Sequence, residues 1–238
     1  MNSNQKVARI VGVLFITGTV AGILSAILTQ PILEASGFLV GVTANQNQLI
    51  IGALFVLIMG FALAMVPVML FPIFRKYNEA LALGSVVFRG VLEAVAYIAI
   101  AVGWLLLIPL SQAYVEAGTP DASSFEISGL LLLEAVGWTN QILAIVFSLG
   151  ALMIYYLFHQ SKLIPRWLSI WGLVGAVLYL TVPLLGMFGM ELGILMVPLA
   201  LQEMVLAVWL LVKGMPTEQD EGLIPNPHRQ QTFQNNVY

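Results

Sequence analysis

Long apolar runs, separated by short polar segments, dominate the pattern of hydrophobic positions along the chain. A transmembrane helix needs about 20 mostly apolar residues to cross a hydrocarbon core of roughly 30 Å. Six runs reach this length, at residues 8–29, 49–74, 83–110, 139–158, 166–188 and 192–212. The pattern therefore predicts an all-α, polytopic membrane protein built as a bundle of six transmembrane helices.

A further apolar segment, residues 123–138, is too short to span a membrane. It opens with Ser123 and Glu126 at the spacing of a capping box, which indicates the start of a helix. Counting it as a crossing would place Lys162 and Arg166 on the opposite side from the other basic residues. We therefore expect an extra external amphipathic helix between spans 3 and 4, joined to the fourth span near Gly137.

The basic residues indicate the orientation of the predicted bundle. Apart from Arg89, all of them lie at alternate ends of the six runs: Lys6, Arg9, Arg75, Lys76, Lys162, Arg166, Lys213 and Arg229. The intervening loops carry acidic residues instead. By the positive-inside rule, both termini are expected in the cytoplasm.

Composition agrees with a membrane location. The chain is 60% hydrophobic and 9% charged, whereas an ordinary soluble domain has roughly 25% charged residues. The lipid bilayer is the expected partner, and there is no basic patch suited to nucleic acid. We expect residues 1–214 to form a single transmembrane domain. The tail at residues 215–238 is rich in Pro, Gln and Asn, so it is expected to be a disordered cytoplasmic tail.

Three charged residues lie inside the apolar runs. At a rise of about 1.5 Å per residue, Arg89 is expected roughly 9 Å from the cytoplasmic end of the third span and Glu93 roughly 15 Å. Glu203, on the sixth span, is expected at the same depth as Glu93. Other polar side chains accompany them, and the predicted intramembrane polar cluster consists of Arg89, Glu93, Glu203, Tyr97, Gln202 and Ser85.

Unpaired charges at such depth are costly, since an Arg or Asp near a helix centre costs about 2.5 to 3.5 kcal/mol on insertion scales. We therefore expect Arg89 to pair with Glu93 and Glu203. One guanidinium cannot neutralise two carboxylates, so one carboxyl is expected to keep its proton near neutral pH.

Two interpretations of this cluster follow. In the first, the cluster is a structural or regulatory clamp. This interpretation predicts a dry cluster in which every polar atom has a hydrogen-bond partner. Alternatively, the protein is a proton-coupled transporter or permease for a small solute, with Glu93 and Glu203 as proton carriers, which predicts a polar cavity touching both residues.

Motifs for catalysis are absent from the sequence. It contains no HExxH, GxSxG or P-loop motif and no cluster of Asp and His residues. The absence of cysteine removes disulfides and thiolate metal ligands. We therefore expect no enzymatic activity, no cofactor and no metal site.

Four stretches carry a family resemblance: "KVARIVGVLFITGTVAGILS" from Lys6, "FPIFRKYNEALALGSVVFRGVLEAV" from Phe71, "SKLIPRWLSIWGLVGAVL" from Ser161 and "ALQEMVLAVWLLVKG" from Ala200. Together they resemble the bacterial integral-membrane family catalogued as domain of unknown function 4386. Members often carry Asn where this chain has Gln202. The resemblance implies a multi-pass protein of the bacterial plasma (inner) membrane, and it implies no particular activity.

Overall fold

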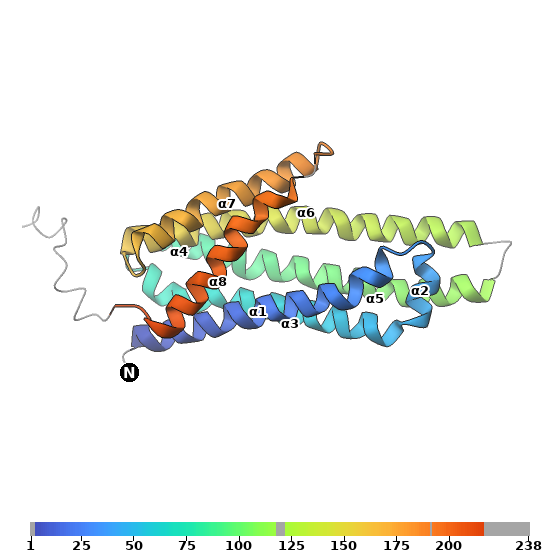
Figure 1. Cartoon of the computed structure of the whole chain (residues 1–238), viewed down its shortest axis with the longest axis horizontal. Helices are drawn as coiled ribbons and strands as arrows, with labels where there is room; N and C mark the ends of the chain where they lie inside the picture. The colour runs from blue at the N-terminus through green and yellow to red at the C-terminus, as the bar shows by residue number, and fades with distance from the viewer. Residues whose placement is uncertain (1–2, 118–121, 191, 217–238) are drawn as a thin grey trace, which may run out of the picture.

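The chain folds as a bundle of long helices (Figure 1). The computed structural model describes residues 3–117, 122–190 and 192–216, and within them there is no β-strand. The elements in order are α1 (Ser3–Leu33), α2 (Phe38–Ala44), α3 (Gln46–Phe74), α4 (Glu79–Ser85), the π-helix η1 (Val86–Leu92), α5 (Glu93–Ala117), α6 (Ala122–Ser161), α7 (Arg166–Gly186), the 3-10 helix η2 (Gly193–Met196) and α8 (Val197–Val212).

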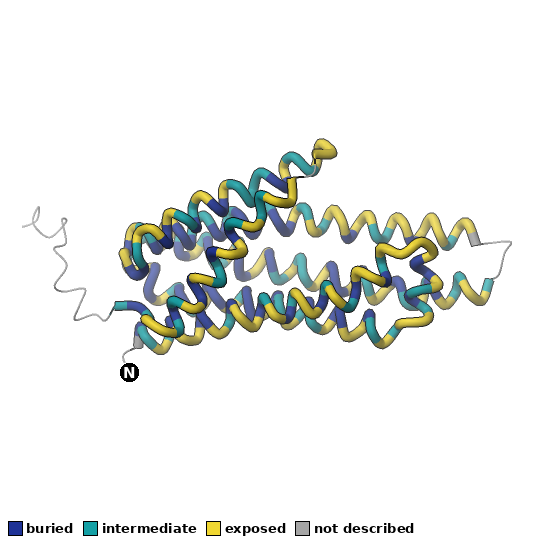
Figure 2. The backbone as a smooth tube through the Cα atoms, in the orientation of Figure 1, coloured by how far each residue is buried: buried dark blue, intermediate teal, exposed yellow. Residues whose placement is uncertain are grey.

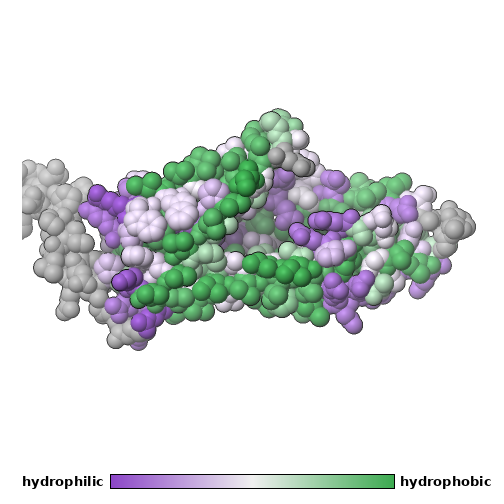
Figure 3. All heavy atoms as spheres, in the orientation of Figure 1, coloured by the Kyte–Doolittle hydropathy of each residue, from purple (hydrophilic) through white to green (hydrophobic). Residues whose placement is uncertain are grey.

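Six helical segments in the described part of the chain are long and apolar enough to cross a membrane. The third joins α4, η1 and α5 into one continuous segment, Glu79–Ala117, and the sixth joins η2 and α8. Large apolar side chains are exposed along the outer faces of these helices (Figures 2 and 3). This exposure is typical of a surface that faces lipid rather than water. The predicted all-α bundle of six spans is confirmed.

The structure differs from the prediction at the segment expected to form a separate external helix. Residues 123–138 belong to α6, which continues without a break to Ser161. Gly137 does not interrupt it, because a glycine inside a helix costs only about 1 kcal/mol. One face of the segment also packs on protein, since Gly129 faces Phe38 of α2 and Val136 faces Gly103 of α5.

The helices differ greatly in length, and this difference shapes the molecule. The 40 residues of α6, at roughly 1.5 Å each, give about 60 Å, twice the thickness of a hydrocarbon core. The 21 residues of α7 give only about 31 Å. As a result α5 and α6 continue beyond the turn between α7 and α8 (Figure 1).

An apolar core of its own stabilises this projecting half. Its buried members come from α1, α2, α3 and α5, and they are Ile32, Phe38, Leu39, Val42, Leu49 and Leu107. Phe125, Leu132 and Leu133 of α6 pack against them. Helix α2, which covers this core, was not predicted, because seven residues are too few for an apolar period to stand out.

The opposite end of the bundle gathers both described ends of the chain and two of the turns. Asn4 of α1 donates a hydrogen bond to the carbonyl of Pro216, 3.2 Å away. The turns between α3 and α4 and between α6 and α7 lie at the same end, at the left of Figure 1. The basic residues of these segments therefore share one end. Beyond Pro216, the predicted disordered tail lies outside the described residues.

The continuity of α6 can be tested with spin labels, because the native chain contains no cysteine. Leu131 is 66% exposed and Tyr156 is 48% exposed, so both accept labels as Leu131→Cys and Tyr156→Cys. Twenty-five residues of unbroken helix give an expected distance between their backbones of about 38 Å. Pulsed electron–electron double resonance on the labelled protein in nanodiscs measures this distance.

A label pair within one unbroken span provides the control. Leu54→Cys and Val68→Cys lie on exposed positions of α3, 14 residues or about 21 Å apart. If the α6 pair gave a markedly shorter distance while the α3 pair gave the expected one, α6 would be bent near Gly137 and the continuous helix would be wrong.

Candidate functional site

Arg89 is the centre of the intramembrane polar cluster. Its side chain is 1% exposed, and Nη2 donates a hydrogen bond to Oε1 of Glu203 over 2.7 Å. Nε lies 3.9 Å from Oε2 of Glu93, which is an ion pair without a hydrogen bond. The structure therefore brings together the three charged residues that the sequence pointed to, from η1, α5 and α8.

Two aromatic rings cover the guanidinium. The Cζ atom of Arg89 lies 4.3 Å from the ring centroid of Phe147 on α6 and 5.6 Å from that of Phe15 on α1. A cation over an aromatic face is attracted by the ring, and the attraction is stronger where water is excluded. Sequence reasoning missed both rings, because a phenylalanine in an apolar run carries no signal that it faces a charge.

The π-helix explains how residues four apart stay on one face. Positions four apart overshoot an α-helical turn of roughly 3.6 residues, so they drift around the axis. A π-helix has wider turns, with hydrogen bonds between residues five apart, and it counters this drift. Ser85, Arg89 and Glu93, which lie before, within and directly after η1, are all buried.

A close approach between α6 and η1 fixes the position of Arg89. A Cβ atom added at Gly150 would lie 2.7 Å from Cβ of Arg89 and 2.9 Å from its backbone nitrogen. Only a glycine fits this contact without a shift of one helix. The backbone that carries the guanidinium is thereby held against α6.

The remaining predicted residues divide into two groups. Ser85 donates a hydrogen bond to the carbonyl of Ala82 (2.7 Å), and Nε2 of Gln202 donates one to the carbonyl of Leu168 (3.0 Å). Both therefore serve the backbone of the bundle rather than the charges. Tyr97, one helical turn after Glu93, packs against Gly60 of α3 and lines a cavity described next.

A cavity of about 550 Å³ lies beside the cluster. Its lining includes Glu203, whose side chain is 12% exposed, together with Tyr97 and Tyr179. Glu93 is fully buried and does not belong to the lining. The cavity therefore reaches one of the two carboxylates, and Arg89 contacts both of them.

The oblique course of α8 creates this cavity. Near its C-terminal end α8 touches α1, where a Cβ on Gly12 would lie 2.8 Å from the carbonyl oxygen of Ala207. Near its start α8 lies instead against α7, at Gly175 (Figure 1). The space left between α1, α6 and α8 is lined by Thr19, Asn140 and other residues, and the surface is hollowed there (Figure 3).

The cluster matches neither interpretation completely. Among the described residues, Nε of Arg89 and both carboxyl oxygens of Glu93 have no hydrogen-bond partner. A clamp with every polar atom bonded would not leave these atoms without partners. A pathway touching both carboxylates would expose Glu93, which is buried.

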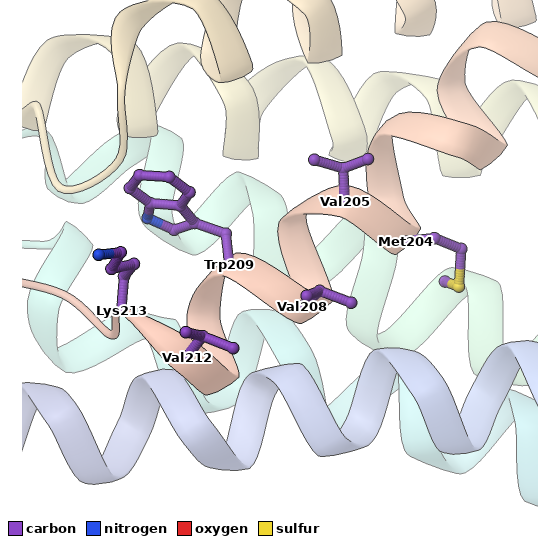
Figure 4. Close-up of a pocket in the computed structure, with 6 residues that line it drawn as sticks. All are labelled: Met204, Val205, Val208, Trp209, Val212 and Lys213. Carbon is purple, nitrogen blue, oxygen red and sulfur yellow. The ribbon is translucent and has the colours of Figure 1, made fainter.

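A second hollow, of about 430 Å³, lies on the outer face of α8 (Figure 4). Its lining is apolar except at one end, and it consists of Met204, Val205, Val208, Trp209, Val212 and Lys213. In a membrane-spanning helix such a surface contacts lipid chains, with Lys213 reaching toward the interface. It has no contact with the charge cluster, so the cavity at Glu203 is the stronger candidate for chemistry.

The fold and the cluster define a multi-pass integral membrane protein with ion pairs inside its spans. Residues 10–214 match the family model described as "Domain of unknown function (DUF4386)", and the chain belongs to this family. Comparison with curated proteins and with solved structures found no match. The resemblance that the sequence suggested is therefore confirmed, and the family description names no activity.

The contact at Gly150 leads to a prediction about the cluster. Gly150→Ala forces a methyl group against the backbone of Arg89, so the free energy of unfolding should fall by about 1–3 kcal/mol, as in other overpacked interiors. Gly137→Ala on the same helix is the control, because nothing lies within 4 Å of its added Cβ. It should leave stability unchanged or raise it by up to about 1 kcal/mol.

Thermal unfolding of the purified variants in detergent, followed by intrinsic tryptophan fluorescence, measures the difference. Equal unfolding midpoints for the two alanine variants would show that α6 does not press on Arg89.

Proposed function

We propose that the protein is a proton-coupled transporter or permease for a small solute, with Glu93 and Glu203 as its proton carriers. The observation that carries this proposal is the cavity that ends at Glu203, a carboxylate inside a span and hydrogen-bonded to Arg89. Ionisable residues within spans that face a cavity commonly mark pathways for protons, ions or substrates.

In this proposal the two carboxyl groups have different roles. Glu203 lies at the cavity and exchanges protons or solute with it. Glu93 pairs with the same guanidinium but lies outside the cavity lining, and it holds a proton where burial disfavours a second negative charge. Arg89 contacts both groups, so a change in charge at one of them alters its attraction to the other.

We further propose that the protein resides in a bacterial plasma membrane with both termini in the cytoplasm. The segments that carry basic residues share one end of the bundle, which the positive-inside rule assigns to the cytoplasm. The cavity lining extends from Glu203 toward the other end of α8, to Met196. Solute would therefore enter from the external side.

A structural or regulatory clamp is the second candidate, and the close contact at Gly150 favours it. Arg89 joins η1, α5 and α8 through its two ion pairs and reaches α1 and α6 through the two phenylalanine rings. A buried group with so many neighbours fixes the register of the helices that it touches. Neither candidate involves catalysis, and we propose no enzymatic activity.

Proton movement in proteoliposomes separates the two candidates. We expect the wild type to show a proton leak or a solute-driven change in internal pH, reported by a trapped pH-sensitive dye. Glu93→Gln and Glu203→Gln should each abolish it, because an amide cannot carry the proton. Glu134→Gln is the matched control, since Glu134 is exposed on α6 and lies outside the cavity lining.

Stability measurements on the same variants complete the test. Removal of one partner from a buried ion pair costs about 3–5 kcal/mol when the other charge is left unpaired. If Glu203→Gln lowers stability by this amount and folded Glu93→Gln and Glu203→Gln both move protons like the wild type, the clamp is the function and transport is contradicted.

A further inference from the structure

The charges beside the cavity do not balance. One guanidinium, Arg89, faces two carboxyl groups, Glu93 and Glu203, which leaves one surplus negative charge when both are ionised. The other titratable groups near them are hydroxyls, Tyr97 on α5, Tyr155 on α6 and Tyr179 on α7. Helix α1 contributes the ring of Phe15, and α3 contributes Met59 and Leu63 to the cavity wall. None of these groups supplies a second cation.

The charges beside the cavity disfavour an anionic ligand. The one cation of the cluster, Arg89, is 1% exposed, lies over the ring of Phe147 and is already bonded to Glu203. An anion in the cavity would therefore meet the carboxylate of Glu203 before it met a cation. A cation, in contrast, meets an accessible carboxylate in surroundings that strengthen the attraction.

The size and lining of the cavity suit a small organic molecule. Its volume of about 550 Å³ lies within the range of roughly 300–1,000 Å³ that is usual for such ligands. Most of the wall is apolar, and the side chains include Met59, Leu143, Phe147, Met196 and Leu199. A ligand with an ammonium group at Glu203 and an apolar body along these side chains would bury both parts favourably.

We infer that the cavity binds a small organic monocation, an amine with an apolar body, in exchange for one proton. This inference rests on the proposed transport function and names its substrate class. The ammonium and the proton compete for the same surplus negative charge. On binding, the O–H bond of the carboxyl group of Glu93 breaks, and its proton passes to water by way of Glu203, the carboxyl group of the two that lines the cavity. An N–H of the ligand then donates to Glu203. The net charge of the site is the same before and after the amine binds.

Arg89 links the two carboxyl groups during this exchange. In the structure it is bonded to Glu203, while its Nε lies 3.9 Å from Glu93 without a hydrogen bond. When Glu93 loses its proton, the guanidinium gains a charged partner on that side. Its bond to Glu203 weakens, and Glu203 becomes free to hold the ammonium. The side chain needs only a small shift, because both partners are already within 4 Å.

Binding of 2-phenylethylamine to the full-length protein in nanodiscs tests the inference, with 3-phenylpropionate as an anion of similar shape. We expect saturable binding of the amine, release of one proton per amine bound, and no binding of the carboxylate. Calorimetry in two buffers of different ionisation enthalpy counts the protons. Where the protonated site dominates, the apparent Kd should rise about tenfold for each unit that the pH is lowered.

Variants distinguish the exchange of an amine for a proton from binding of the amine at Glu203 alone. Glu93→Gln should weaken amine binding at least tenfold although Glu93 does not line the cavity, because the site then lacks its surplus charge. Ala200→Trp fills the cavity from an exposed lining position without altering any charge, so it should abolish binding even if Glu93→Gln fails to fold. Glu134→Gln should bind like the wild type.

The outcomes separate this inference from the proposed function. Proton movement in proteoliposomes without amine binding would overturn the inference and leave transport standing. Amine binding with proton release, but without any flux, would support the inference and contradict transport. Equal binding of amine and carboxylate, or amine binding with no proton released, would contradict the inference that an amine binds in exchange for one proton.

Discussion

The ion pair between Arg89 and Glu203 is the interaction on which the arrangement of the bundle depends. Inside a bilayer a guanidinium without a partner is costly, so the helices that carry the two residues must meet. This requirement brings α8 across the bundle to η1 and places Phe147 and Phe15 around the charge. The glycine at position 150 then allows α6 to close against the backbone of Arg89. Several helices are thus positioned by one charge that water cannot reach.

The same ion pair determines where the cavity can lie. Because α8 is drawn to η1 in its middle, to α1 near its end and to α7 near its start, it cannot follow α1 along its whole length. The divergence leaves a hollow with a carboxylate at its inner boundary. A packing constraint and a cavity are therefore consequences of one geometry, which is why a clamp and a solute pathway are not opposed in structural terms.

Much of this architecture follows from the sequence, and the failures have specific causes. The six spans were predictable because length and hydropathy alone decide whether a helix can cross a bilayer. The meeting of Arg89, Glu93 and Glu203 was predictable because equal depth and the cost of a buried charge leave few alternatives. Polar character alone did not predict that Ser85 and Gln202 donate their hydrogen bonds to backbone carbonyl groups. The π-helix and the cavity depend on contacts between distant segments, and such contacts leave no local pattern. Helix α6 continues past Gly137 because a glycine inside a helix costs little.

The great length of α6 has a practical consequence. With a mass of 25.9 kDa, the protein offers electron microscopy little signal outside the surrounding micelle. The hairpin of α5 and α6 continues past the turn between α7 and α8 and is held by its own apolar core. A rigid binding domain raised against the outer parts of α5 and α6 would move as one body with the spans. Image alignment could then rely on it.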